Sequence, residues 1–206
     1  KELFPLMKNV QTWDIEQGDA EFLIDIEDDI FDFVHSSHCL EHLNDPREGL
    51  KNWIRILKKG GYLIVTVPDE DLYEQGVFPS DFNNDHKWTF TIYKEKSWSK
   101  KSINLLEFLK GFSPLIEIKS ISQLTSSYRY SLPRYDQTLT PIGECGIEFI
   151  LRKRLDEEIE FGGYFNNHNE QPAKNIRIHL NQYKNDLNFL KKNNKKEPPY
   201  SDDNLL

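Results

Sequence analysis

The segment from Phe31 to Pro68 constrains the fold of this chain more than any other part of the sequence. It opens with an apolar run at Phe31, Phe33 and Val34, which predicts a short buried strand. A second apolar run, Tyr62–Val67, predicts another strand. The residues between them have helical spacing, so the segment predicts a strand–helix–strand unit, one half of an α/β sheet.

Local signals mark where the intervening helix begins and ends. Asp45 suits the N-cap and Pro46 the first helical residue. One apolar stripe follows at helical spacing: Leu50, Trp53, Ile54 and Leu57. Lys58–Lys59 suit the negative end of the helix dipole, and Gly60–Gly61 are expected to end the helix.

A cluster of polar and titratable residues, SSHCLEH at positions 36–42, follows the first strand directly. Open α/β sheets bind their ligands beyond the carboxyl ends of their strands. The sequence therefore predicts a functional site at this turn.

Composition narrows the class of protein. The 206 residues suffice for one domain with a real core. A formal net charge of -8 argues against a nucleic-acid partner. No apolar run approaches the ~20 residues of a membrane span, and no signal peptide opens the chain. Cys39 and Cys145 have neither metal nor disulfide spacing, so we expect a cytoplasmic protein.

The remainder of the chain divides into an ordered part and a polar extension. The long segment 69–98 has little periodicity and is typical of a functional loop. Ile103–Leu109 predicts a helix, and Leu115–Ile121 and Gly146–Leu151 predict strands. We expect one domain over residues 1–155. Residues 156–206 are predicted to be a polar extension, disordered at its end and helical at most over 174–192.

Three words of the sequence resemble the class I S-adenosylmethionine-dependent methyltransferases. They are FDFVHSSHCLEHL (Phe31–Leu43), ILKKGGYLIVTVP (Ile56–Pro68) and WDIEQGDAEF (Trp13–Phe22). With PDEDLYEQG and DHKWTFTI further on, the chain looks like a bacterial branch, over about three quarters of its length. The resemblance implies a three-layer Rossmann-like sheet, mostly parallel with an antiparallel terminal hairpin, and S-adenosylmethionine as cofactor.

The chain departs from that family in one respect. The family's glycine-rich loop, D-x-G-x-G, holds the methionine part of the cofactor, but no glycine occurs here before Gly18. We expect the sequence to begin just after that loop. The alternative is that the first strand is absent, in which case the cofactor would bind poorly or not at all.

The resemblance also implies a set of cofactor-binding residues. Asp14 would accept hydrogen bonds from the ribose hydroxyls, and Asp19 and Ala20 would bind the adenine. Ser36 and Ser37 would lie at the strand-to-helix turn, close to the methyl group. The alternative for Asp14 and Asp19 is that each belongs to an ordinary surface turn.

Two histidines are candidate catalytic residues. His38 is the expected general base, because an imidazole takes up a hydroxyl proton near neutral pH; its alternative is a role in packing the turn. His86 is expected to form a second acid–base pair with Asp85. His38 and His42, with Glu41 near them and Asp85–His86 further on, also invite a metal interpretation. A His-x-x-x-His pair alone is a weak signal, and we expect no metal.

Candidate substrate residues follow the second strand. Tyr73 and Glu74 are expected to line the acceptor pocket, Trp88 to stack on a ring, and Arg134 to favour a phosphate or carboxylate. The acidic run 69–71 suits a cationic or polyhydroxyl substrate, or equally a solvated surface.

Together these features predict transfer of a methyl group from S-adenosylmethionine to an oxygen of a small molecule. By analogy the acceptor is a sugar or phosphorylated intermediate of surface or capsular polysaccharide biosynthesis. The alternatives are N-methylation of a small amine and a non-catalytic protein of the same fold that binds a partner. A homodimer is a further possibility.

Overall fold

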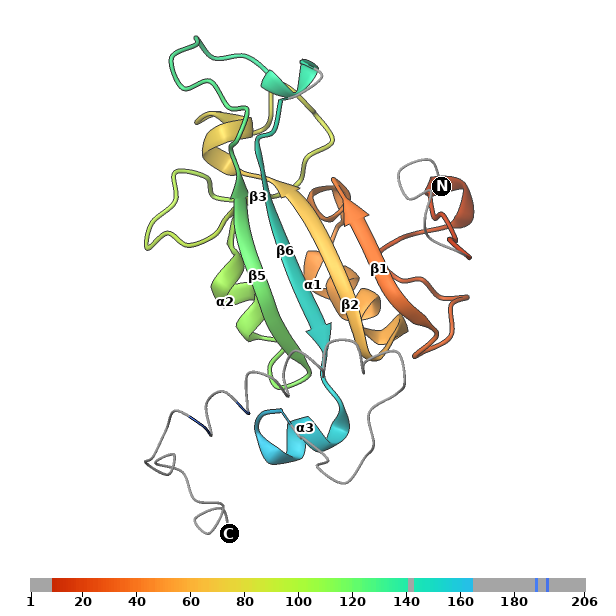
Figure 1. The fold of residues 1–206 in the computed structure, drawn as a ribbon. Helices are drawn as coiled ribbons and strands as arrows, with labels where there is room; N and C mark the ends of the chain where they lie inside the picture. Colours follow the sequence, from red (N-terminus) through yellow and green to blue (C-terminus); the bar gives the residue numbers. More distant parts are fainter. Residues whose placement is uncertain (1–8, 141–142, 165–187, 189–191, 193–206) are drawn as a thin grey trace. The chain divides into compact units, whose positions relative to one another are not determined.

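The computed structural model describes residues 9–140 and 143–164, with residues 188 and 192. The compact unit that contains the first two ranges ends at Tyr164 (Figure 1). Nowhere in the described part of the chain is a helix both long and apolar enough to span a membrane. Of the helix expected over 174–192 only residues 188 and 192 are described, and the rest lies outside the described residues. The domain boundary at residue 155 stays a prediction.

One four-stranded sheet forms the centre of the unit (Figure 1). Its strands lie in the order β1 (Phe31–Ser37), β2 (Leu57–Pro68), β6 (Gly146–Lys153) and β5 (Ile116–Leu124). β1 and β2 are parallel, whereas β6 is antiparallel to both β2 and β5. The described sheet is therefore mixed rather than mostly parallel, and the antiparallel hairpin expected at its end is confirmed.

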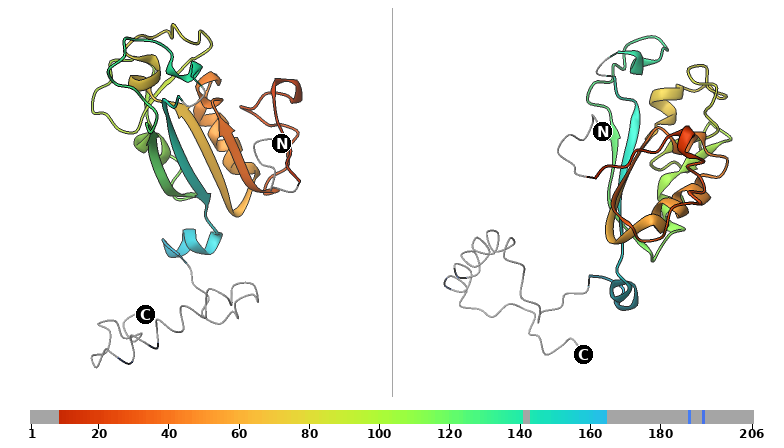
Figure 2. Two further views of the ribbon diagram at one scale, coloured as in Figure 1. Left: turned by 45° about the horizontal axis from the view of Figure 1, so that its top comes forward. Right: turned by 90° about the vertical axis from the view of Figure 1, so that its right-hand side faces the viewer.

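Helices cover one face of this sheet. α1 (Pro46–Ile56) and α2 (Leu105–Lys110) both lie on the same side, as the two further views show (Figure 2). The core beneath them is built from alternate residues of the strands and the apolar stripes of the helices: Leu50, Trp53, Leu63, Val65, Leu105 and Phe149. The expected α/β class is confirmed, but the described residues form two layers rather than the predicted three.

The start of α1 is as predicted, and its end is not. The Asp45 carboxylate accepts hydrogen bonds from the N–H groups of Arg47 and Glu48 at 2.8 and 3.3 Å. The helix ends at Ile56, and residues 58–61 belong to β2. The register between β1 and β2 shifts there, and Gly60 has a φ of +82°, which a glycine adopts without strain. The glycines thus permit a bulge in a strand instead of ending a helix.

α2 is shorter than the sequence predicts. Ile103 lies in β4 (Ser102–Asn104), which pairs with β3 (Thr89–Thr91) in a separate parallel ribbon. Leu106, expected in the apolar stripe, is 41% exposed, and Phe108 is buried in its place. The predicted strands near 115–121 and 146–151 are confirmed as β5 and β6, each a few residues longer.

The described N-terminal residues contain a single 3-10 turn, η1 (Ile15–Gln17), and no short strand. Two contacts tie this segment to α1. The buried Glu21 carboxylate accepts hydrogen bonds from the N–H groups of Asn44 and Asp45, at 2.8 and 3.2 Å. The Trp53 indole N–H donates to the carbonyl of Ala20 at 2.8 Å.

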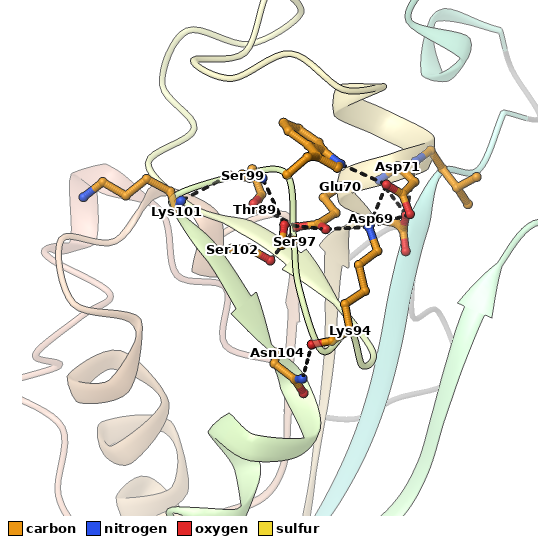
Figure 3. A network of polar contacts seen from close by, with 12 residues as sticks. Asp69, Glu70, Asp71, Thr89, Lys94, Ser97, Ser99, Lys101, Ser102 and Asn104 are labelled. Carbon is orange, nitrogen blue, oxygen red and sulfur yellow. Dashed lines mark hydrogen bonds and ion pairs between the residues drawn. The ribbon is translucent and has the colours of Figure 1, made fainter.

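The acidic residues after β2 belong to a network of polar contacts with the segment 94–102 (Figure 3). The Glu70 side chain is 0% exposed and accepts hydrogen bonds from four donors: Lys94 at 2.6 Å, Ser97 at 2.8 Å, Ser102 at 2.5 Å and Thr89 at 3.2 Å. Asp71 accepts from Lys94 and from the Trp98 indole. Both carboxylates therefore hold the segment 94–102 in place, Glu70 from the interior and Asp71 from the surface, where its side chain is 51% exposed.

We expect Glu70→Ala to lower the free energy of unfolding by about 3 kcal/mol, because it leaves several donors without their acceptor. The matched control is Asp32→Ala, which removes an exposed carboxylate paired with Lys58 at 2.8 Å. Exposed pairs contribute under about 1 kcal/mol. Urea unfolding followed by circular dichroism measures both, and equal losses would contradict the anchoring role of Glu70.

Candidate functional site

Strand β1 ends where the sequence predicts the site. Ser36 and Ser37 lie within the strand, paired with Val65 and Thr66, and not in the turn as expected. The N–H of His38 extends this pairing by donating to the Thr66 carbonyl at 2.9 Å. His38 itself has a φ of +52°, in the left-handed region, so the chain turns sharply at this residue.

A cavity of about 880 Å³ runs along β1. Of the residues expected to bind the cofactor, Ala20, Ser36 and Ser37 line it. Trp13 and Cys39 line it as well, the first from the N-terminal segment and the second from just beyond β1. The cavity is therefore lined by two of the three sequence words that carry the family resemblance, Trp13–Phe22 and Phe31–Leu43, and by Ile56 at the start of the third.

Asp14 and Asp19 both have local roles in the backbone. The Asp14 carboxylate caps η1, with Oδ1 accepting from the N–H of Ile15 at 2.7 Å. Oδ1 of Asp19 accepts from the N–H of Glu21 at 2.8 Å, as in an ordinary Asx turn. Neither residue lines the cavity wall itself.

The pKa of the Cys39 thiol depends on the burial and the charges near this end of β1. Burial is the main cause that raises its pKa, to about 11, and the carboxylates of Glu41, Asp19 and Asp14 act in the same direction. Asp14 and Asp19 are thus close enough to the cavity to act on its wall. At neutral pH Cys39 is a neutral thiol, which excludes it as a nucleophile.

A second, smaller cavity of about 200 Å³ lies on the other side of the same turn. Its lining residues come from four separate segments: His38, His42, Tyr73, Asn83, His86 and Thr138. Three histidines therefore face one space: His38 and His42 are neighbours in sequence, and His86 comes from a distant loop. The sequence indicated His38, His86 and Tyr73 but gave no signal for Asn83 or Thr138.

The histidines of this cavity have partners that differ from those expected. Nδ1 of His86 lies 2.7 Å from Oε1 of Glu74, whereas Asp85 pairs with His42, at 2.9 Å between Oδ2 and Nδ1. The predicted Asp85–His86 pair is therefore wrong. His86 and Glu74 are both buried, while His38 is 50% exposed.

Glu41 was named from the sequence only as a neighbour of His38 and His42, and its complete burial was not predicted. Its side chain is 0% exposed, and Oε1 lies 3.3 Å from Nδ1 of His38. Neither carboxylate oxygen has a hydrogen-bond partner among the described residues. An acidic residue between an apolar Leu40 and a histidine was the available signal, but its burial depends on contacts with the distant loop 83–87.

The remaining candidate substrate residues divide into two groups. Tyr73 lines the small cavity, and burial raises its pKa to about 12, so its phenol is neutral at neutral pH. Trp88 instead donates its indole N–H to the Leu43 carbonyl at 2.9 Å and has Lys101 over its ring. The Arg134 guanidinium donates hydrogen bonds to the Asp81 carboxylate at 2.9 Å and to the Glu74 carbonyl at 3.1 Å. The structure does not bring Trp88 or Arg134 to the wall of either cavity.

Residues 5–65 match the family model described as a methyltransferase domain. The match spans the N-terminal segment, β1, α1 and most of β2, and so includes the words Trp13–Phe22 and Phe31–Leu43 around the large cavity. No curated protein matches the sequence.

Several solved structures are similar to part of the chain. The [4+2]-cyclase SpnF is 19% identical, over 66% of this chain and 54% of that one, with a TM-score of 0.44. A possible histamine N-methyltransferase from Thermotoga maritima is 26% identical over 67% and 62%, with a TM-score of 0.44. A putative methyltransferase from Bacillus halodurans is 17% identical over 75% and 86%, with a TM-score of 0.46. The chain thus spans 54% and 62% of the length of the first two.

Because the pKa of Cys39 is raised to about 11, we expect its alkylation at pH 8 to be about 100-fold slower in the folded than in the urea-unfolded protein. Iodoacetamide labelling over time, mapped by mass spectrometry, measures this rate. Labelling of Cys39 as fast in the folded as in the unfolded protein would contradict a neutral, buried thiol.

Proposed function

We propose that this chain transfers a methyl group from S-adenosylmethionine to an oxygen of a small molecule. The single observation that carries the proposal is the methyltransferase-domain match over residues 5–65, whose N-terminal segment and β1 together border the large cavity.

The large cavity fits the proposed cofactor in size and in chemistry. Its volume of about 880 Å³ lies within the usual range of ligand pockets. Oδ1 of Asp19 accepts the hydrogen bond of its turn. Its other oxygen, Oδ2, would accept from the exocyclic amine of an adenine placed beside Ala20, the next residue, which lines the cavity. Ser36 and Ser37 lie at the other wall, beside the turn at His38. When bound, the cofactor supplies an electrophilic methyl group on a sulfonium.

We assign the general base to His38. Its Nδ1 faces the buried Glu41 carboxylate at 3.3 Å, and its side chain is 50% exposed. Nε2, on the other side of the ring, is therefore the nitrogen that an acceptor reaches. An imidazole in this position takes the proton from an acceptor hydroxyl as the oxygen is methylated. The neutral phenol of Tyr73 serves as a hydrogen-bonding group for the acceptor.

The acceptor proposed is a sugar or a phosphorylated intermediate of surface-polysaccharide biosynthesis. Support comes from the polar lining of the small cavity, where Asn83 and Thr138 offer an amide and a hydroxyl for polyhydroxyl recognition. The buried Glu41 beside this cavity would equally attract a small protonated amine. N-methylation is therefore the second candidate, and it requires prior removal of the amine's proton.

The first test of the function is calorimetric titration of S-adenosylhomocysteine, followed by transfer of a radiolabelled methyl group to a panel of nucleotide sugars and small amines. Binding together with labelling of a hydroxyl supports the proposal. Binding with no labelled product from any acceptor would favour the non-catalytic alternative, and labelling of amines alone would favour N-methylation.

We expect Asp19→Asn to weaken S-adenosylhomocysteine binding about tenfold, because the amide keeps the Asx turn but removes the charge that strengthens the bond to the adenine amine. Calorimetry measures the affinity. Asp25→Asn, an exposed aspartate in the same segment, is the matched control and should bind as the wild type does. An unchanged affinity in Asp19→Asn would remove this residue from the site.

His38→Gln is expected to lower turnover about 100-fold or more while leaving S-adenosylhomocysteine affinity within about twofold, because only the proton acceptor is lost. The labelled-methyl assay and calorimetry measure the two quantities. In His38→Ala, added imidazole should restore part of the activity. A parallel fall of affinity and turnover, without rescue by imidazole, would contradict the assignment of the base.

A further inference from the structure

Glu41, His42 and His86 bring three electron-pair donors to one point. Nε2 of His42 lies 3.9 Å from Oε1 of Glu41, and Nε2 of His86 lies 4.0 Å from the same oxygen. One ligand atom from each residue lies within 4.8 Å of the other two. Two of the residues come from η2 (Leu40–His42) and the third from the distant loop before β3, so the tertiary fold creates the cluster.

The other ring nitrogens of both histidines assign their tautomers. Nδ1 of His42 faces Oδ2 of Asp85 at 2.9 Å and the Asp85 carbonyl at 3.2 Å. Nδ1 of His86 faces Oε1 of Glu74 at 2.7 Å. These oxygens only accept, so each Nδ1 carries a hydrogen, and Nε2 is the atom of each ring that faces Glu41.

Glu41 makes this arrangement unstable without a further positive charge. Its side chain is fully buried, and neither of its oxygens accepts a hydrogen bond from any described residue, since His38 at 3.3 Å is poorly aligned. A buried carboxylate without a hydrogen-bond partner is costly. A cation bound between Glu41 and the two Nε2 atoms would remove this cost.

We propose that Glu41, His42 and His86 bind a divalent transition-metal ion such as Zn²⁺ or Mn²⁺. Two imidazoles and one carboxylate are a typical ligand set for such ions. The carboxylates of Asp85 and Glu74 face Nδ1 of the two rings, and carboxylates in this position orient metal-bound histidines. The remaining coordination positions face the cavity of about 200 Å³, which His38 and Tyr73 also line.

The binding proposal is independent of methyl transfer, but its consequence for an acceptor rests on the proposed function. A metal ion at the floor of the small cavity would bind an acceptor hydroxyl directly and make it easier for His38 to deprotonate. It would thereby favour oxygen over nitrogen acceptors and fix the orientation of the acceptor in the small cavity. The expectation of no metal, drawn from the sequence, would then be reversed.

The test uses Co²⁺ as a spectroscopic probe, without any cofactor or acceptor. The chelator-treated 206-residue protein is titrated with CoCl₂ and followed by visible absorption and calorimetry. We expect one equivalent to bind. Glu41→Gln, which keeps the size of the side chain and adds a donor for the histidines, should weaken this binding at least about 100-fold. Asp85→Asn, an exposed outer partner, should weaken it about tenfold or more.

His35→Gln is the matched control, since it removes a histidine of β1 that lies outside the cluster and should leave Co²⁺ affinity unchanged. Absence of a saturable Co²⁺ site in the wild type would overturn the proposal. So would binding in Glu41→Gln that equals the wild type, because the ion would then lie elsewhere. Because no methyl transfer is measured, failure of the proposed function leaves both outcomes readable.

Discussion

The position of both cavities depends on the pairing of β2 with its two neighbours. β2 lies between β1 and β6, and its inward residues Leu63, Val65 and Val67 are completely buried. Each such side chain contributes about 1.5–3 kcal/mol of burial. The same strand receives the N–H of His38 at Thr66, while Asp69, just after it, donates to the Cys145 carbonyl. The end of this strand therefore sets where the turn at His38 and the acidic run begin.

The way the fold treats its other buried carboxylates makes Glu41 exceptional. Glu70 accepts from one lysine and three hydroxyls, Glu21 from two backbone N–H groups, and Glu158 from the Arg152 guanidinium. For Glu158 this guanidinium is the main cause of a lowered pKa. Glu74 pairs one oxygen with His86 and leaves the other without a hydrogen-bond partner, whereas Glu41 leaves both oxygens without one, and both carboxylates lie beside the same histidine. Costs of this kind persist at functional sites because a ligand removes them.

How much of this could be predicted from the sequence follows the range of the interactions involved. The cap at Asp45 and the strands β1, β2, β5 and β6 depend on neighbours within a few residues, and their patterns predicted them. The exchange of partners between Asp85 and His86 depends on how the loop 75–88 folds over η2, to which no local pattern is sensitive. Trp88 and Arg134 have the chemistry of substrate ligands, but backbone carbonyls far away in sequence hold them instead. The residue types predicted which chemical groups are present. Only the tertiary contacts decide which of these groups face a cavity and which are bonded to the protein itself.

The left-handed turn at His38 separates the linings of the two cavities. Every residue of β1, Phe31–Ser37, lines the large cavity, as does Cys39 beyond the strand, whereas His38 lines the small one. His38 has a φ of +52°, so the extended strand ends there and the side chain of His38 does not continue along the large cavity. Methyl transfer requires the donor sulfur, the methyl carbon and the acceptor oxygen in one line. An acceptor held in the small cavity, with its hydroxyl at His38, would meet a methyl group that arrives from the Ser37 side, and the left-handed turn at His38 brings the two cavities to the same edge of the sheet.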